Sequence, residues 1–336
     1  MKEALFYKSL EKQKVQCNLC PHQCIIKPDN TGICHVRKNI DGKLYSLVYE
    51  KPIAQSLDPI EKKPLFHFYP GTNAYSIATV GCNLKCMHCQ NYDISQDMGN
   101  FFGSSSVSAE QIVTSAINSG ATSIAYTYTE PTIFYEYAYD ITQIARKKDI
   151  KNVFVTNGYI SQEPLDRIAP YIDAANIDLK AMSESFYQKI CKAHLQPVLD
   201  TIQRYYEHNI WIEITTLIIP DYNDSEQELR QIAEFICDID TKIPWHVTAF
   251  HPTYKLTNTK RTTSEILEKA VSIGEKEGLD YIYQGNLLQG EDTYCPKCHT
   301  LLIKRSGFHI MENNISNHTC PTCKHDLSNE IISNNN

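Results

Sequence analysis

Three cysteines within residues 79–91 constrain this chain more than any other feature of its sequence. Cys82, Cys86 and Cys89 are spaced C-x3-C-x2-C and follow the largely apolar run 74–80 and Gly81. The run is typical of a buried strand, and the glycine permits a tight turn into a loop. Cysteine thiolates are the usual ligands of iron–sulfur clusters, and three of them leave one iron of a [4Fe–4S] cube without a protein ligand. The loop is therefore predicted to hold a cluster whose open iron can bind a substrate or a cofactor.

Strand-like and helix-like segments alternate after this loop. A capping box at residues 108–111 and apolar side chains at helical spacing in 229–236 mark two of the helices. This alternation is the signature of a parallel sheet, so the sequence predicts an α/β fold, a partial (β/α)6 barrel over residues 71–290. The predicted strands are 74–80, 123–128, 152–156, 174–179, 210–217, 246–250 and 280–284.

Polar side chains follow four of these strands. Parallel barrels carry their chemistry at the carboxyl ends of the strands, which is where such side chains gather. A single acid after a strand is more often the cap of a helix. Several of them beside a three-cysteine loop are instead predicted to surround one site. The residues are Glu130, Asn157, Asp178, Lys180 and His251.

These motifs resemble those of radical S-adenosylmethionine (SAM) enzymes of the pyruvate formate-lyase activating type, over residues 75–290. The cysteines match the family's C-x3-C-x-φ-C motif, with His88 at the position that is usually aromatic. Glu130 lacks the family's two preceding glycines, and Val155 stands where activating enzymes often carry an acid. More narrowly, the chain is similar to the radical SAM member of the AmmeMemoRadiSam system over nearly its whole length. That similarity is carried by Cys17-x2-Cys20-Pro21-His22, Asp58–Pro64 and Gly81-Cys82-Asn83.

The resemblance implies a [4Fe–4S] cluster on Cys82, Cys86 and Cys89 and a bound SAM molecule. SAM carries an ammonium, a carboxylate and a ribose, so it needs anionic, cationic and hydrogen-bonding partners. Glu130 suits the ammonium, and Lys180 suits the carboxylate. The other predicted SAM contacts are Asp178, Asn157, His251 and His88, the last with its ring flat against the adenine.

The implied activity is a reductive cleavage of SAM to methionine and a 5′-deoxyadenosyl radical. A one-electron donor such as flavodoxin or ferredoxin is the implied partner, and the radical abstracts hydrogen from a polypeptide or small-molecule substrate. Activation of a glycyl-radical enzyme is the alternative. A non-catalytic metal scaffold is the rival from another class. The three-cysteine loop disfavours that rival, because closed structural sites use four ligands.

A second group of cysteines lies in the N-terminal region, residues 1–70. Cys17, Cys20, Cys24 and Cys34 are spaced C-x2-C-x3-C-x9-C, with His22 as a spare donor. Four soft ligands in a short, loop-rich segment predict a metal, either zinc or an auxiliary iron–sulfur cluster, and the spacing does not choose between them. A turn at Asp41-Gly42 predicts a hairpin, and residues 58–68 are expected to form an arm that packs over one end of the barrel.

A third group of cysteines predicts a small separate module in residues 291–336. Two C-x2-C knuckles 21 residues apart are typical of zinc ribbons and rubredoxins, so zinc or iron is expected there. About 45 residues need such a metal because they cannot build a stable core alone. Residues 333–336 are expected to be disordered. The four ligands are Cys295, Cys298, Cys320 and Cys323.

Composition narrows the cellular setting and the partners. Eleven of the thirteen cysteines fall in the three groups, so they are read as metal ligands of a cytoplasmic protein, with Cys191 and Cys237 left as ordinary core or surface residues. The formal net charge of −7 disfavours nucleic acid as a partner. No apolar run approaches the roughly 18 residues of a membrane span, and no signal-peptide core is present. We therefore expect no membrane association.

Overall fold

The computed structural model describes residues 1–96, 105–287 and 289–333, so the predicted disorder at residues 334–336 lies outside the described residues. An eight-stranded sheet runs through the centre of the chain, and its parallel strands follow one another in sequence order. β7 (Ala54–Pro59) pairs antiparallel with the first of them and forms one edge. The parallel strands are β8 (Asn73–Ala78), β9 (Ser123–Tyr126), β10 (Lys151–Thr156), β11 (Ala174–Asp178), β12 (Trp211–Ile218), β13 (Trp245–Ala249) and β14 (Ile282–Gly285).

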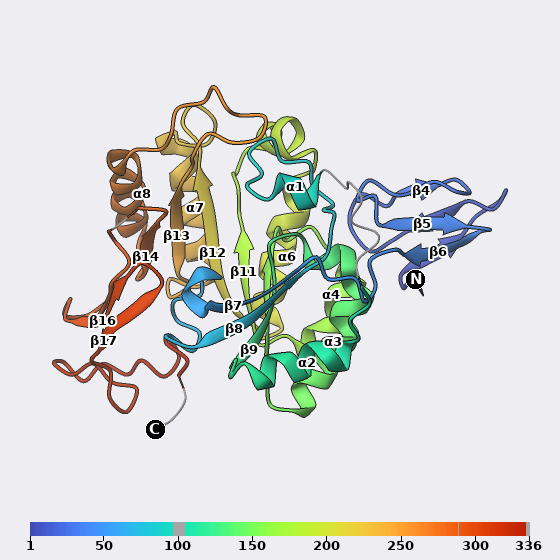
Figure 1. Cartoon of the computed structure of the whole chain (residues 1–336). Helices are drawn as coiled ribbons and strands as arrows, with labels where there is room; N and C mark the ends of the chain where they lie inside the picture. The colour runs from blue at the N-terminus through green and yellow to red at the C-terminus, as the bar shows by residue number, and fades with distance from the viewer. Residues whose placement is uncertain (97–104, 288, 334–336) are drawn as a thin grey trace.

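Helices connect the parallel strands, which confirms the predicted α/β fold (Figure 1). The predicted capping box opens α2, because the Ser108 hydroxyl accepts from the Gln111 N–H and the Gln111 side chain accepts from the Ser108 N–H. Within the described ranges, no helix is both long enough and apolar enough to cross a membrane. The helices are α1 (Tyr92–Ser95), α2 (Ala109–Asn118), α3 (Tyr135–Lys147), α4 (Gln162–Ile168), α5 (Glu184–Phe186), α6 (Gln196–Glu207), α7 (Glu226–Ile239) and α8 (Ser264–Glu277).

The N-terminal region forms two small antiparallel sheets that dock on α3. The predicted hairpin at Asp41-Gly42 is confirmed as the connection between two paired strands. Arg37 is buried and donates two hydrogen bonds of 2.9 and 3.0 Å to the Glu136 carboxylate of α3, which also accepts from the Leu5 N–H at 2.8 Å. The sheets consist of β1 (Lys2–Glu3), β6 (Lys43–Ser46) and β5 (Arg37–Ile40), and of β2 (Tyr7–Ser9), β3 (Val15–Cys17) and β4 (Ile25–Ile26).

Residues 60–69 form an arm that covers the amino-terminal end of the sheet. Three of its apolar side chains are buried against the first residues of the parallel strands, in a cluster that includes Ala74, Ala125 and Val153. Because β7 and β14 are not paired with each other in the part of the chain that the structure describes, the sheet is an open barrel. The arm covers the amino-terminal end of this open barrel with buried apolar side chains. Its three side chains are Ile60, Leu65 and Phe68.

The C-terminal module packs against this arm. Its strands are β15 (Thr293–Tyr294), β16 (Leu301–Ser306) and β17 (His309–Asn313). The Arg305 guanidinium donates to the Phe66 carbonyl at 2.8 Å and lies 4.4 Å from the centre of the Phe66 ring. Figure 1 shows the two cysteine-rich ends of the chain on opposite sides of the central sheet.

His67 joins the arm, the module and β14 through both of its ring nitrogens. The Glu330 carbonyl can only accept, so His67 Nδ1–H donates to it at 2.5 Å. Nε2 is then the acceptor for the Tyr283 hydroxyl, also at 2.5 Å. Burial lowers the pKa of His67 to about 4 from an ordinary value of 6.5. The His67 ring of the folded protein is therefore neutral near pH 7.

We expect the His67→Asn variant to lose part of the pH dependence of stability. The unfolded chain takes up a proton at His67 below pH 6.5, whereas the folded chain does so only near pH 4. The stabilisation that depends on a neutral His67 is thus complete above pH 6.5 and decreases by up to about 3 kcal/mol as the pH falls toward 4. Urea unfolding at several pH values measures the free energy of unfolding of the parent and the variant. The stability difference between parent and variant should shrink toward pH 4, and the exposed His309→Asn control should show no such change. Parallel pH profiles for parent and His67→Asn would contradict this account.

Candidate active site

The cluster-binding loop leaves the carboxyl end of β8 through Gly81. This residue has φ of +99°, which is the left-handed region that favours glycine. A Cβ atom added there would lie 2.9 Å from the Cys34 carbonyl oxygen and 2.8 Å from a Val36 methyl group. The N-terminal module therefore presses directly on the start of the loop. Only glycine satisfies both the backbone conformation and this close approach.

The far side of the loop is held by a segment that the sequence did not single out. A single π-helical turn, Tyr187–Cys191, follows α5. Its last two carbonyl groups accept from the loop, from Lys85 N at 2.8 Å and from Met87 N at 3.0 Å. Such turns are frequent at functional sites, but no local sequence pattern predicts them. Cys191 is fully buried there, so the residue expected to be ordinary core in fact anchors the loop.

The three loop thiols are partly buried and already have polar neighbours. Cys82 Sγ accepts from the Leu84 N–H at 3.4 Å and from Asn157 Nδ2 at 3.6 Å, and Cys89 Sγ lies 3.1 Å from the Ser95 hydroxyl. A hydrogen bond with Cys191 is the main cause that lowers the pKa of Cys86, against the effect of burial. Burial raises the pKa of Cys82 and of Cys89, and the Leu84 N–H and the Ser95 hydroxyl oppose that rise because donors to sulfur stabilise the thiolate, which is the form that binds iron.

Glu130 connects the ends of β9 and β10 to the loop. Its buried carboxylate accepts from Thr132 N at 3.0 Å, from the Thr156 hydroxyl at 2.9 Å and from Asn157 N at 2.8 Å. Burial raises the pKa of Glu130, and these donors oppose that rise. Asn157 then donates to the Asn83 side chain at 2.9 Å, next to Cys82. The structure thus brings Glu130, Asn157 and Cys82 into one hydrogen-bonded chain.

Asp178 and Lys180 form an ion pair of 2.7 Å beyond the end of β11. Their side chains are 37% and 13% exposed, so the pair can be reached by a ligand, whereas Glu130 is only 1% exposed. Burial opposes a charge on Lys180, but Asp178 and the thiol of Cys86 raise its pKa well above the usual range. A cation held beside the thiol of Cys86 can bind a carboxylate.

The two histidines of the predicted site lie in different surroundings. His88 is 5% exposed, and its Nδ1 has no hydrogen-bond partner within the described residues. Burial, with a smaller effect of Lys180, lowers the pKa of His88 to about 3, so its ring is neutral. Its ring centre lies 6.2 Å from that of Phe186. His251 follows β13 and is exposed, and within the described residues it makes no hydrogen bond or ion pair with the other predicted residues.

These residues fit a cysteine-bound cluster with a charged organic cofactor beside it. Cys82, Cys86 and Cys89 supply three thiols with donors around them, and Asp178 with Lys180 offers both charges at an accessible place. The unpartnered nitrogen of His88 is a buried polar atom of the kind that a ligand satisfies.

Comparisons with known proteins agree with this arrangement. The model of the Radical SAM superfamily matches residues 76–236. The uncharacterized protein MJ0808 of Methanocaldococcus jannaschii is 45% identical over 96% of this chain and 98% of its own length. The pyruvate formate-lyase 1-activating enzyme of Escherichia coli is 21% identical over 59% of this chain and 87% of its own. The crystal structure of Streptococcus suis SuiB bound to precursor peptide SuiA has a TM-score of 0.50 at 14% identity, covers 68% of this chain and 52% of its own, and shows a shared fold.

The close approach at Gly81 predicts a selective effect of Gly81→Ala. We compare it with Gly278→Ala, because Gly278 has φ of +103° but open space around its Cβ position. Both variants carry the backbone strain of alanine at positive φ, about 1 kcal/mol or more. Gly81→Ala should lower the thermal midpoint further and should also reduce the iron bound after reconstitution. Equal iron content in the two variants would argue against contact of the N-terminal module with the loop.

Proposed function

Because the chain belongs to the radical SAM superfamily, we propose that Cys82, Cys86 and Cys89 hold a [4Fe–4S] cluster whose fourth iron binds SAM. When bound, this cluster supplies the electron that cleaves SAM to methionine and a 5′-deoxyadenosyl radical, which abstracts hydrogen from the substrate. The observation that supports the assignment most strongly is the three-thiol loop at the carboxyl end of β8 with donors to its sulfurs. The chain is an enzyme rather than a metal scaffold, since its family model and its activating-enzyme relatives describe enzymes.

The residues around the loop divide into two groups. We assign direct contact with SAM to Lys180 for the carboxylate and to Asp178 for a donor group, because this pair is charged and accessible. Glu130 already accepts four hydrogen bonds from the protein, so we propose that it positions Asn157 and the loop beside the ammonium of SAM. The remaining proposed contacts are His88 against the adenine and the exposed His251 at the outer part of the pocket.

The substrate class follows less directly. We propose hydrogen abstraction from a polypeptide or a small molecule, with the electron supplied by a donor of the flavodoxin or ferredoxin class. A second candidate is activation of a glycyl-radical enzyme. The similarity to the pyruvate formate-lyase 1-activating enzyme of Escherichia coli favours that candidate. A lasting glycyl-radical signal on a protein of a cell extract, after incubation with reduced enzyme and SAM, would support the second candidate over the first.

Loss of one cluster ligand tests the cofactor assignment. We expect the anaerobically reconstituted parent to show an electron paramagnetic resonance signal that changes when SAM is added. Cys86→Ala should lose this signal, because two thiolates are too few to hold the cube. Cys237→Ala is the matched control, since that thiol lies apart from the three groups and bonds the Glu277 carbonyl. A parent signal that SAM leaves unchanged, with iron and sulfide fully loaded, would contradict the proposed function.

Substitution of the ion pair tests the SAM contacts separately from the cluster. Lys180→Met and Asp178→Asn should keep the iron and sulfide content of the parent. Each loses a charge-assisted contact worth about 1.5 to 3 kcal/mol, so the Kd of SAM should rise by about 10-fold to 100-fold. Lys189→Met, at an exposed position of the π-helical turn, is the control and should bind SAM like the parent. If Lys180→Met also keeps the parent Kd, the pocket lies elsewhere.

A further inference from the structure

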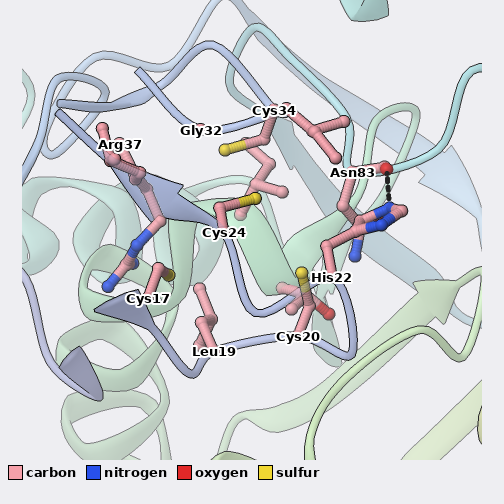
Figure 2. Close-up of a pocket in the computed structure, with 13 residues that line it drawn as sticks. Cys17, Leu19, Cys20, His22, Cys24, Gly32, Cys34, Arg37 and Asn83 are labelled. Atoms are coloured by element: carbon pink, nitrogen blue, oxygen red, sulfur yellow. Dashed lines mark hydrogen bonds between the residues drawn. The ribbon is translucent and has the colours of Figure 1, made fainter. Parts of the chain in front are cut away.

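The four N-terminal cysteines line one pocket behind the cluster-binding loop. Figure 2 shows the sulfur atoms of Cys17, Cys20, Cys24 and Cys34 around this space. Cys17 and Cys34 are buried, and the other two are partly exposed. A backbone hydrogen bond brings two of the four together, because Cys17 N donates to the Cys24 carbonyl at 3.0 Å.

The spacing of these thiols differs from that of the C-terminal group. The Sγ atoms of Cys295, Cys298, Cys320 and Cys323 all lie within 4.8 Å of one another, with two pairs at 3.6 Å. Four sulfurs placed 2.3 Å from a single zinc ion are about 3.8 Å apart, so the C-terminal group has the size of a single-ion site. Among the described residues this is the only group whose ligand atoms all lie within 4.8 Å of one another. No three of the N-terminal thiols meet this limit.

The proposed SAM-cluster cysteines provide an internal comparison. Cys82, Cys86 and Cys89 are likewise too far apart to form a compact single-ion group in the described parts of the chain. A polynuclear cluster needs this wider spread, because each thiolate binds a different iron. The N-terminal group resembles the loop cysteines in this respect, since no three of its thiols form a compact single-ion group, and it offers one more ligand.

The walls of the pocket suit a buried anionic group. Leu19, Ile26 and Ile133 provide apolar contacts, and Arg37 places a 2% exposed guanidinium beside the thiols. Two nitrogens of Arg37 bond Glu136 and the Leu5 carbonyl, but its buried Nε has no partner within the described residues. Iron–sulfur clusters accept hydrogen bonds at sulfur, so Nε–H of Arg37 is a candidate donor to the group in the pocket.

We propose that Cys17, Cys20, Cys24 and Cys34 bind a second [4Fe–4S] cluster. With four protein ligands it has no open iron, so it exchanges single electrons and does not bind SAM. It accepts one electron from a reduced carrier of the ferredoxin or flavodoxin class and returns one electron to the oxidised form of such a carrier. His22 of the same pocket donates to the Asn83 carbonyl at 2.8 Å, directly beside Cys82, so the loop of the proposed SAM cluster is in hydrogen-bonded contact with this site (Figure 2).

The pocket has a cavity volume of about 20 Å³, which is room for roughly one water molecule. A cluster is larger, so its loading requires the partly exposed Cys20 and Cys24 side chains to move outward.

The experiment counts clusters in the full-length chain. A Cys82→Ala/Cys86→Ala/Cys89→Ala variant, reconstituted anaerobically with iron and sulfide, should retain about four irons and four sulfides per chain. Its reduced signal should be insensitive to SAM, and further substitution with Cys24→Ser should abolish it. Cys298→Ser is the control and should change the content of the single C-terminal ion but not the sulfide content. A triple variant that carries zinc at this site and no acid-labile sulfide would overturn the proposal.

The parent protein gives a second readout that does not depend on the folding of variants. It should contain about eight sulfides per chain and show two reduced signals, of which only one responds to SAM. About four sulfides with a single SAM-responsive signal would overturn the second cluster and leave the proposed function intact. A signal that never responds to SAM, with about four sulfides, would support the N-terminal cluster and contradict the proposed function.

Discussion

The structure depends on a carboxylate buried inside the barrel at its amino-terminal end. Glu213 of β12 has no exposed surface, and it accepts from the Phe66 and His67 backbone N–H groups at 2.9 and 2.8 Å. It also accepts from His246 Nε2 of β13 at 2.7 Å, which is the main influence that lowers its pKa against burial. A buried charge is stable only when it is paired and fully hydrogen-bonded. The arm supplies the two backbone donors that this carboxylate needs, so folding of β12 and docking of the arm are coupled.

Docking of the arm has consequences at the opposite end of the barrel. Asp58, where β7 leads into the arm, accepts from the buried Lys63 at 2.7 Å and from the Ser76 hydroxyl of β8 at 2.7 Å. It also accepts from the Tyr128 hydroxyl, two residues before Glu130. These donors lower the pKa of Asp58 although burial opposes them. The motif Asp58–Pro64 thus ties the arm to β8 and to the segment that carries Tyr128 and Glu130.

Local patterns in the sequence were enough to predict the alternating strands and helices of the fold. Every predicted parallel strand is present within a few residues, and the capping box and hairpin are confirmed, because periodicity and turn chemistry act over short distances. The edge strand β7 was not predicted, since its mixed residues acquire strand character only by pairing with β8. The π-helical turn and the role of Glu213 were also missed. Their partners lie far away in the sequence, and no local pattern encodes such contacts.

In the candidate site, too, the sequence predicted which residues are present but not which groups they contact. The sequence identified Glu130 as an acid after a strand. Only the structure shows that Thr132, Thr156 and Asn157 already donate hydrogen bonds to its carboxylate. Glu130 therefore orients the neighbouring backbone and Asn157. The accessible pair of Asp178 and Lys180 instead presents charged groups that a ligand can contact.

The two flanking cysteine groups support different parts of the structure. The N-terminal group supports the cluster-binding loop, through Cys34 against Gly81 and His22 against Asn83. The C-terminal group supports the arm, because the module that it closes supplies Arg305 to Phe66 and Glu330 to His67. Neither support comes from the sheet itself, whose edges stay open in the described residues. A metal bound at either group would therefore hold a segment that strand pairing does not hold, the cluster-binding loop at one end of the barrel and the arm at the other.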